Sequence, residues 1–269
     1  MAFDFHKNPK VYFDQQTTNA EAYVVPFIEE KMPITPDTTV MEVGCGEGGV
    51  LRAFHRKGCK TIGVELSEYR VNLAKDLLQD EIAGGKMEII CSDIFDVDFS
   101  GKFQGYFDLI ILKDVIEHIH GQAKLIQDLK QFLTPSGKIF FGFPPWQMPF
   151  GGHQQMCNVK FLSRLPFFHL LPKPLYKGML QAFGEKPRTI EELLEIKDTG
   201  ISLERFERIV RQTGYQIVHK QLYFINPIYQ FKFGLKPRKQ IPILGSIPYL
   251  RNFVNTAGFY LIGRKGDTV

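Results

Sequence analysis

Residues 40–49 read VMEVGCGEGG, and this stretch decides the fold because an apolar, β-branched run passes directly into a glycine-rich loop. A helix-like pattern follows at residues 50–57. Glycines allow a ligand to approach the backbone closely, and the first turn of the following helix has free N–H donors. The stretch therefore predicts a strand, a loop and a helix that bind a small molecule at the loop.

Short apolar runs alternate with helical patterns on both sides of this loop. Strands that alternate with helices build parallel sheets, so the sequence predicts an α/β fold with a doubly wound, mostly parallel, Rossmann-like sheet of seven strands. The expected strands are 39–43 (TVMEV), 60–66 (KTIGVEL), 87–93 (MEIICSD), 107–114 (FDLIILKD), 138–144 (KIFFGFP), 215–225 and 257–264. The expected helices are 21–31, 50–57, 68–81, 122–132 and 202–212, the last capped by Ser202 and stopped by Gly214.

Two long segments interrupt this alternation. Residues 144–201 are rich in proline, glycine and aromatic residues, and residues 226–256 are punctuated by proline, aromatic and basic. Long loops in a compact domain usually carry function, so we expect a substrate cap in the first and a basic aromatic loop in the second. Both would be insertions in a domain at 39–269, preceded by an N-terminal helical lid segment at 1–38.

The composition is that of an ordinary globular protein, with 269 residues, 44% hydrophobic and 23% charged, which excludes disordered and collagen-like classes. The net charge is +4, but residues 220–269 contain eight Lys or Arg and one acid, giving +7 there and −3 elsewhere. The basic cluster at 236–239 is too short to predict nucleic-acid binding. We expect solvated surface there, with contact to an anionic substrate or a membrane as the alternative.

The four cysteines form no CxxC pair and no spacing suited to zinc, so we expect reduced, buried thiols and no metal site. They are Cys45, Cys59, Cys91 and Cys157. The first ten residues are polar, and no apolar run approaches the roughly 18 residues of a spanning helix. A cytoplasmic location is therefore expected.

The charge of the glycine loop separates two classes of cofactor. Gly44, Gly46 and Gly49 satisfy the GxGxxG dinucleotide fingerprint. However, Glu42 precedes the loop and Glu47 lies within it, and two carboxylates would repel a pyrophosphate. S-adenosylmethionine has a sulfonium and an ammonium group and no phosphate, so an acidic loop favours it over NAD.

Acidic residues also end the next three expected strands. Glu65 is placed to accept hydrogen bonds from both ribose hydroxyls, and Asp93 to accept one from an adenine amino group while Ile94 covers the ring. Lys113 and Asp114 end the fourth strand. The carboxyl ends of parallel strands share one edge of the sheet, so these side chains are expected to line one crevice.

On these motifs, residues 39–144 resemble the class I S-adenosylmethionine-dependent methyltransferases, in particular the small-molecule group that includes the ubiquinone and menaquinone methyltransferases. KDVIEHI at 113–119 and LTPSGKIFFGFP at 133–144 look like later motifs of that family, and the two closing strands match its antiparallel finish. The resemblance implies an enzyme that converts S-adenosyl-L-methionine into S-adenosyl-L-homocysteine, with an aromatic lid on the cofactor, Tyr12 or Phe13, from the N-terminal segment. The implied cofactor residues are Tyr12, Glu42, Gly44, Cys45, Gly46, Glu65, Leu66, Asp93, Ile94, Lys113 and Asp114.

Two histidines are candidates for a catalytic base. His118 follows Asp114 by four residues in an expected helical turn, and His153 follows paired glycines after the fifth strand. A neutral imidazole can accept a hydroxyl proton near pH 7. Either histidine could instead support its loop, because the methyl donor is already activated and alignment alone accelerates transfer. We expect O-methylation of a small apolar or aromatic molecule.

Other interpretations stay open. The chain could be a non-catalytic S-adenosylmethionine-binding or interaction protein, or, less favoured, an NAD-dependent oxidoreductase. Residues 161–177 could cap an apolar substrate, rest on lipid with basic residues near headgroups, or pack on the sheet or on another subunit. A peripheral membrane contact through 161–177 or 226–256 therefore remains an alternative, and the sequence leaves the oligomeric state undetermined.

Overall fold

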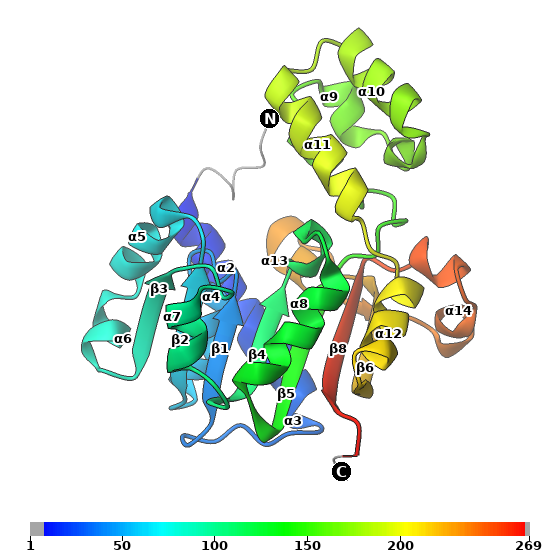
Figure 1. Ribbon diagram of the computed structural model, residues 1–269. Helices are drawn as coiled ribbons and strands as arrows, with labels where there is room; N and C mark the ends of the chain where they lie inside the picture. Colours follow the sequence, from blue (N-terminus) through cyan, green and yellow to red (C-terminus); the bar gives the residue numbers. More distant parts are fainter. Residues whose placement is uncertain (1–7, 267–269) are drawn as a thin grey trace.

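The structure is a computed structural model that describes residues 8–266, and its centre is one eight-stranded sheet (Figure 1). The strand order is β3-β2-β1-β4-β5-β8-β6-β7. Strands β1 to β5 are parallel, and β8 runs antiparallel between β5 and β6. The bounds are β1 Thr39–Val43, β2 Lys60–Glu65, β3 Met87–Cys91, β4 Phe107–Lys113, β5 Leu133–Phe143, β6 Tyr215–Ile225, β7 Arg238–Lys239 and β8 Ala257–Arg264. The expected α/β fold with an antiparallel closing strand is confirmed.

The expected count of seven strands is wrong by one. The additional strand, β7, pairs two residues with the edge strand β6, and a pair this short has no alternation of apolar residues from which to predict it. Strand β5 begins five residues before the expected Lys138, because its first residue pairs with Phe107 before a shift in register. Strands β1, β6 and β8 have the expected bounds.

Helices cover both faces of the sheet (Figure 1). The N-terminal helix is longer than expected, since α2 begins at Pro9 behind the cap residue Asn8 and continues through a π-helical stretch into α3. The expected helix 68–81 divides at Leu78, and α7 was not expected. The helices of this part are α2 Pro9–Asn19, η1 Ala20–Val24, α3 Val25–Glu29, α4 Gly49–Arg56, α5 Glu68–Leu77, α6 Gln79–Ala83, α7 Val97–Lys102, η2 Ile116–His118, α8 Gln122–Asp128, η3 Leu129–Phe132 and α12 Leu203–Gln212.

Residues 144–201 form a helical lobe above the carboxyl edge of the sheet (Figure 1). Its helices are α9 Lys160–Arg164, α10 Lys173–Ala182 and α11 Pro187–Thr199, with short 3-10 turns η4 Gln154–Met156 and η5 Phe168–Leu170. Buried side chains of the lobe pack on one another, apart from the sheet: Cys157, Leu162, Phe168, Tyr176, Leu180, Ile190 and Leu193. At the base of the lobe, the Thr199 hydroxyl donates to the Glu117 carbonyl at 2.7 Å, which ties α11 to the turn after β4.

Residues 226–256 contain α13 Ile228–Phe233, β7, α14 Pro242–Ser246 and the 3-10 turn η6 Leu250–Asn252. Helix α13 lies against the N-terminal helix, where the Gln15 amide donates to the Phe231 carbonyl at 3.1 Å and the Tyr23 hydroxyl bonds to Gln230 at 2.6 Å. Segments more than 200 residues apart in sequence therefore meet above the sheet.

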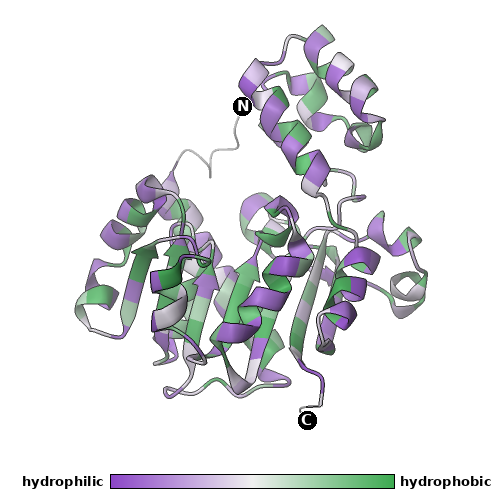
Figure 2. Ribbon diagram, viewed as in Figure 1, coloured by the Kyte–Doolittle hydropathy of each residue, from purple (hydrophilic) through white to green (hydrophobic). Residues whose placement is uncertain are grey.

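Hydrophobic residues concentrate on the strands and on the inward faces of the helices (Figure 2). All four cysteines are free, and Cys45, Cys59 and Cys157 are buried. The expectation of a buried thiol is wrong for Cys91, which is exposed because it ends the edge strand β3. Within residues 8–266, none of the helices has the length and apolar character to cross a membrane.

Candidate active site

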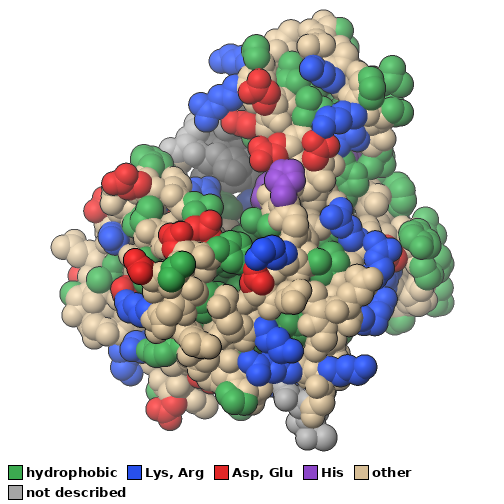
Figure 3. Space-filling view, viewed as in Figure 1, with side chains coloured by type: hydrophobic (Ala, Val, Ile, Leu, Met, Phe, Trp, Pro, Cys, Tyr) green, Lys and Arg blue, Asp and Glu red, His purple; other side chains and the backbone are tan. Residues whose placement is uncertain are grey.

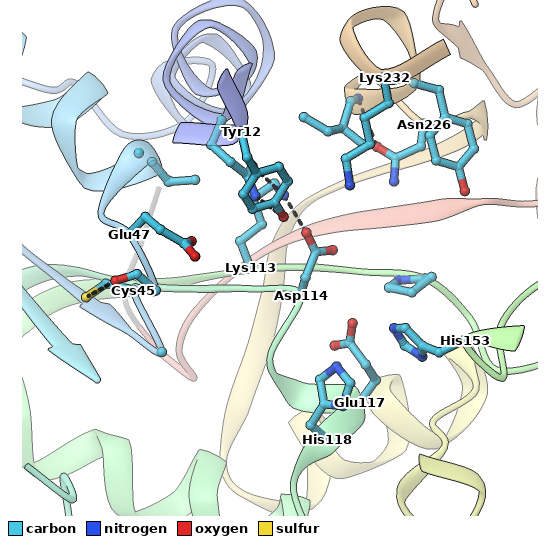
Figure 4. A pocket seen from close by; sticks show the side chains of 18 of the residues that line it. Tyr12, Cys45, Glu47, Lys113, Asp114, Glu117, His118, His153, Asn226 and Lys232 are labelled. Atoms are coloured by element: carbon cyan, nitrogen blue, oxygen red, sulfur yellow. Dashed lines mark hydrogen bonds and ion pairs between the residues drawn. The ribbon is translucent and has the colours of Figure 1, made fainter. Parts of the chain in front are cut away.

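A cavity of about 350 Å³ opens at the carboxyl ends of β1, β4 and β5, beneath α2 and α13 (Figure 4). At one end it meets the glycine loop, where positive φ angles of 66° at Gly44 and 54° at Gly46 favour glycine. Its lining residues include Tyr12, Phe13, Gln16, Glu42, Gly44, Cys45, Gly46, Glu47, Lys113, Asp114, Glu117, His118, Met148, Phe150, His153, Asn226, Tyr229 and Lys232. The cavity thus brings together nine of the thirteen expected site residues.

Glu42 is the buried acid at the glycine-loop end. Glu42 is the last residue but one of β1 and is 3% exposed, and its Oε2 atom has no hydrogen-bond partner among the described residues. Burial raises the pKa of Glu42 to about 8, although the Lys113 ammonium acts in the opposite direction. A cationic group placed in the cavity would satisfy this carboxylate and return its pKa toward the ordinary range.

Lys113 and Asp114 form a close ion pair in the middle of the cavity (Figure 4). The Lys113 Nζ donates to Asp114 Oδ2 at 2.5 Å and to Gln16 Oε1 at 3.3 Å. Burial acts to raise the pKa of Asp114, but the neighbouring ammonium outweighs it and lowers the pKa. Because Lys113 is already paired with Asp114, Glu42 has no ion-pair partner of its own among the described residues when it ionises.

Four expected cofactor residues, Glu65, Leu66, Asp93 and Ile94, lie outside the cavity lining. Glu65 accepts hydrogen bonds from the Gly46 and Ser67 backbone N–H groups, each at 3.0 Å, and so holds the loop in place. Asp93 accepts from the backbone of its own turn, Leu66 is 70% exposed and Ile94 is buried. Each Glu65 oxygen keeps a lone pair for a ribose hydroxyl, so the cofactor role of these four residues stays a prediction.

The roof of the cavity comes from both ends of the chain. The Gln16 amide donates to the Tyr12 hydroxyl at 2.7 Å, and the Lys232 ammonium lies 5.0 Å from the centre of the Tyr12 ring. Burial lowers the pKa of Lys232 to about 8. The sequence indicated an aromatic lid but gave no sign of Lys232 or Tyr229, because no local pattern places α13 against the N-terminal helix beside Tyr12.

The opposite end of the cavity holds two histidines and a carboxylate (Figure 4). The rings of His118 and His153 have centroids 5.0 Å apart, and His153 has a positive φ of 55°. Burial lowers the pKa of His153 to about 4, so its imidazole is neutral at pH 7. Beside them Glu117 is 4% exposed, and burial raises the pKa of its carboxyl well above the ordinary range. Glu117 was missed as a site residue, although it lies within the KDVIEHI motif.

The parallel sheet, its antiparallel closing strand and the cavity at the glycine loop define a class I methyltransferase fold. The sequence profile of the family described as "Methyltransferase domain" matches residues 16–184, more than half of the chain. The chain therefore belongs to the methyltransferase-domain family, and the resemblance to the class I S-adenosylmethionine-dependent methyltransferases is confirmed.

Individual curated relatives match a shorter part of this chain than the family profile does. The ubiquinone biosynthesis O-methyltransferase of Coxiella burnetii is 28% identical over 102 residues, which are 38% of this chain and 42% of that protein. The chloroplastic tocopherol O-methyltransferase of Arabidopsis thaliana is 33% identical over 101 residues, 37% of this chain and 28% of that protein. The chain thus spans less than half the length of these relatives.

Solved structures agree in fold over nearly the whole chain. A geranyl diphosphate C-methyltransferase of Streptomyces coelicolor, solved with Mg²⁺, geranyl diphosphate and S-adenosyl-L-homocysteine, superposes with a TM-score of 0.54 at 14% identity, covering 91% of this chain and 80% of that chain. A putative sarcosine dimethylglycine methyltransferase of Galdieria sulphuraria gives 0.58 at 12% identity, covering 94% and 87%. At these identities the likeness establishes the fold alone.

Proposed function

We propose that this protein transfers the methyl group of S-adenosylmethionine to an oxygen atom of a small, apolar or aromatic acceptor. One observation carries the proposal: a single cavity joins an acidic glycine loop, suited to a cationic donor, to a neutral histidine pair beside Met148 and Phe150. The relatives named for ubiquinone and tocopherol act, by their names, at oxygen. They support oxygen as the acceptor atom.

In the proposed reaction the acceptor oxygen attacks the methyl carbon of the donor. It approaches from the side opposite the sulfonium sulfur, in line with the breaking C–S bond. The oxygen lone pair forms the new O–C bond, the C–S electron pair returns to sulfur, and S-adenosylhomocysteine leaves with a neutral thioether. The hydroxyl proton passes to a base or to water. With a pKa of about 4, His153 is a weak base at pH 7, so alignment in a closed cavity supplies more of the acceleration than proton abstraction by this residue.

Titration calorimetry tests the donor half of this proposal. The protein is expected to bind S-adenosylmethionine and S-adenosylhomocysteine and to bind NADH at least about 100-fold more weakly, since Glu42 and Glu47 repel a pyrophosphate. Equal affinity for NADH, or no affinity for the two adenosyl compounds, would overturn the proposal. Cofactor binding without release of S-adenosylhomocysteine across a panel of phenols and alcohols would favour the non-catalytic alternative.

The C-terminal half supports a proposed peripheral contact with an anionic membrane. Residues 226–256 expose large apolar side chains, including Ile243 at 74% and Tyr249 at 73%, and hydrophobic side chains gather at the right edge of Figure 3, where Figure 1 places α14. Phe167 of the helical lobe lies 6.3 Å from Phe253, so residues 161–177 adjoin this surface. The exposed cations Lys236, Arg238 and Lys239 match anionic headgroups in charge.

Vesicle sedimentation checks this contact. The protein is expected to bind phosphatidylcholine vesicles that contain phosphatidylglycerol, more weakly at high salt, and Ile243→Asp combined with Tyr249→Asp is expected to abolish binding. Val97→Asp replaces an apolar residue that is 84% exposed on α7 and serves as the matched control. Binding that survives the double substitution, or an equal loss with the control, would contradict a contact at this surface.

A further inference from the structure

The acceptor end of the cavity holds a cluster whose charges and hydrogen bonds are incomplete. Both carboxylate oxygens of Glu117 are buried without a hydrogen-bond partner among the described residues, and so is Nδ1 of His153. One ligand atom each from Glu117, His118 and His153 lies within 4.8 Å of the others. In Figure 4 the Glu117 carboxylate points into the space between the two imidazole rings.

A buried carboxylate without a partner is costly, because it gives up water and receives nothing in return. The nearby ammonium of Lys113 already forms an ion pair with Asp114 at 2.5 Å. Neither imidazole forms a hydrogen bond with the Glu117 carboxyl group, and Nδ1 of His153 is itself buried without a partner among the described residues. A ring nitrogen without a hydrogen-bond partner, such as Nδ1 of His153, has a lone pair available to ligate a metal ion.

We propose that Glu117, His118 and His153 bind a divalent transition-metal ion at the acceptor end of the cavity. Two neutral imidazoles and one carboxylate are a donor set for Zn²⁺, Mn²⁺, Fe²⁺ or Co²⁺, whereas Mg²⁺ and Ca²⁺ favour all-oxygen sets. Ligands of a tetrahedral ion at about 2.1 Å lie roughly 3.4 Å apart, so the three side chains have to rotate toward one another when the ion binds. Three protein ligands leave open positions that face the cavity.

This location suggests what the ion would do. An acceptor hydroxyl bound at an open position loses its proton to water more readily, because the cation stabilises the oxyanion. The oxyanion then attacks the methyl group as already described. This second step rests on the proposed methyl transfer, whereas binding of the ion does not.

Cobalt is the sharpest probe because its visible absorption reports the ligands directly. Tag-free, chelator-treated protein is expected to bind one equivalent of Co²⁺ with a visible spectrum typical of nitrogen and oxygen ligands, and Zn²⁺ is expected to displace it. Glu117→Gln and His153→Asn are expected to weaken binding by more than about 10-fold. Both variants should fold, since Glu117→Gln keeps the size and shape of the side chain and asparagine, like histidine, adopts the positive φ found at position 153. The equilibrium unfolding temperature of each without metal checks this.

His120→Asn is the matched control, because His120 is exposed two residues after His118 and contacts Glu195 outside the cluster. It is expected to bind Co²⁺ like the parent protein. Absence of stoichiometric binding, or binding that Glu117→Gln leaves unchanged, would overturn the proposal and favour a protonated Glu117 that donates to His153. Calorimetry with S-adenosylmethionine on the same metal-free protein separates this failure from failure of the proposed function, because the donor end contains none of the three ligands.

Discussion

Replacing Glu42 with glutamine is expected to weaken S-adenosylmethionine binding by about 10- to 100-fold while stabilising the unliganded protein at alkaline pH. The substitution preserves shape but removes the buried charge that faces the glycine-loop end of the cavity. Binding loses an electrostatic partner, whereas the empty fold loses an unfavourable buried carboxylate. Opposite signs for affinity and stability are the signature of a charge that is retained for a cationic ligand.

The expected difference in stability between Glu42→Gln and the parent protein depends on pH. Below about pH 4.5 the carboxyl is neutral in both the folded and the unfolded state, so the two proteins should be equally stable. Between about pH 4.5 and 8 only the unfolded state ionises, so the free energy of unfolding of the parent falls by up to about 1.4 kcal/mol per pH unit relative to Glu42→Gln. Above about pH 8 the difference should level off. Thermal unfolding of both proteins at a series of pH values from acid to alkaline measures this difference.

Two controls test whether the expected loss of S-adenosylmethionine affinity comes from the charge of Glu42. Adenosine, which lacks the ammonium and sulfonium groups, should bind the parent and Glu42→Gln alike. Glu88→Gln, which removes an exposed acid that pairs with Lys102 at 3.3 Å, should change neither affinity nor the pH profile. If Glu42→Gln bound S-adenosylmethionine as tightly as the parent, Glu42 would have no part in donor recognition.

The second large effect is expected at Gly49, where helix α4 meets the N-terminal helix. A Cβ atom at this position would lie 2.6 Å from the Phe13 carbonyl oxygen and 2.7 Å from the Gln16 Cβ. Gly49→Ala should therefore push α2 away, lower the free energy of unfolding by about 1–3 kcal/mol and weaken cofactor binding, because α2 carries the Tyr12 roof. Chemical unfolding and calorimetry measure the two effects.

Gly178→Ala gives the matched control on another helix. Gly178 lies in α10, is exposed, and an added Cβ would meet nothing within 4 Å. At this position the same substitution should raise the free energy of unfolding by about 0.5–1 kcal/mol and leave the affinity for the cofactor unchanged. A Gly49→Ala protein as stable as Gly178→Ala, with unchanged cofactor affinity, would show that contact between α2 and α4 does not hold the roof in place.

Local sequence predicted the central sheet well because the signal for each buried strand is contained in the strand itself. Runs such as TVMEV at 39–43 are apolar on both faces, as a parallel strand covered by helices requires, and glycines mark the loop that follows. The helices of residues 144–201 were harder to predict from the sequence. The lobe's apolar residues pack on one another around several prolines, and no single helix has a strong hydrophobic pattern of its own.

The sequence by itself determined the sheet, the acidic glycine loop and nine of the residues that line the cavity, because spacing along a strand and its loop fixes which side chains reach the sheet edge. Only the tertiary structure decided that α13 covers Tyr12 and that Glu117 lies beside His153 at the end of the cavity opposite the glycine loop. These contacts join segments 36 to 220 residues apart. No local propensity encodes such contacts, since they form only when the helical lobe and the C-terminal segment pack above the finished sheet.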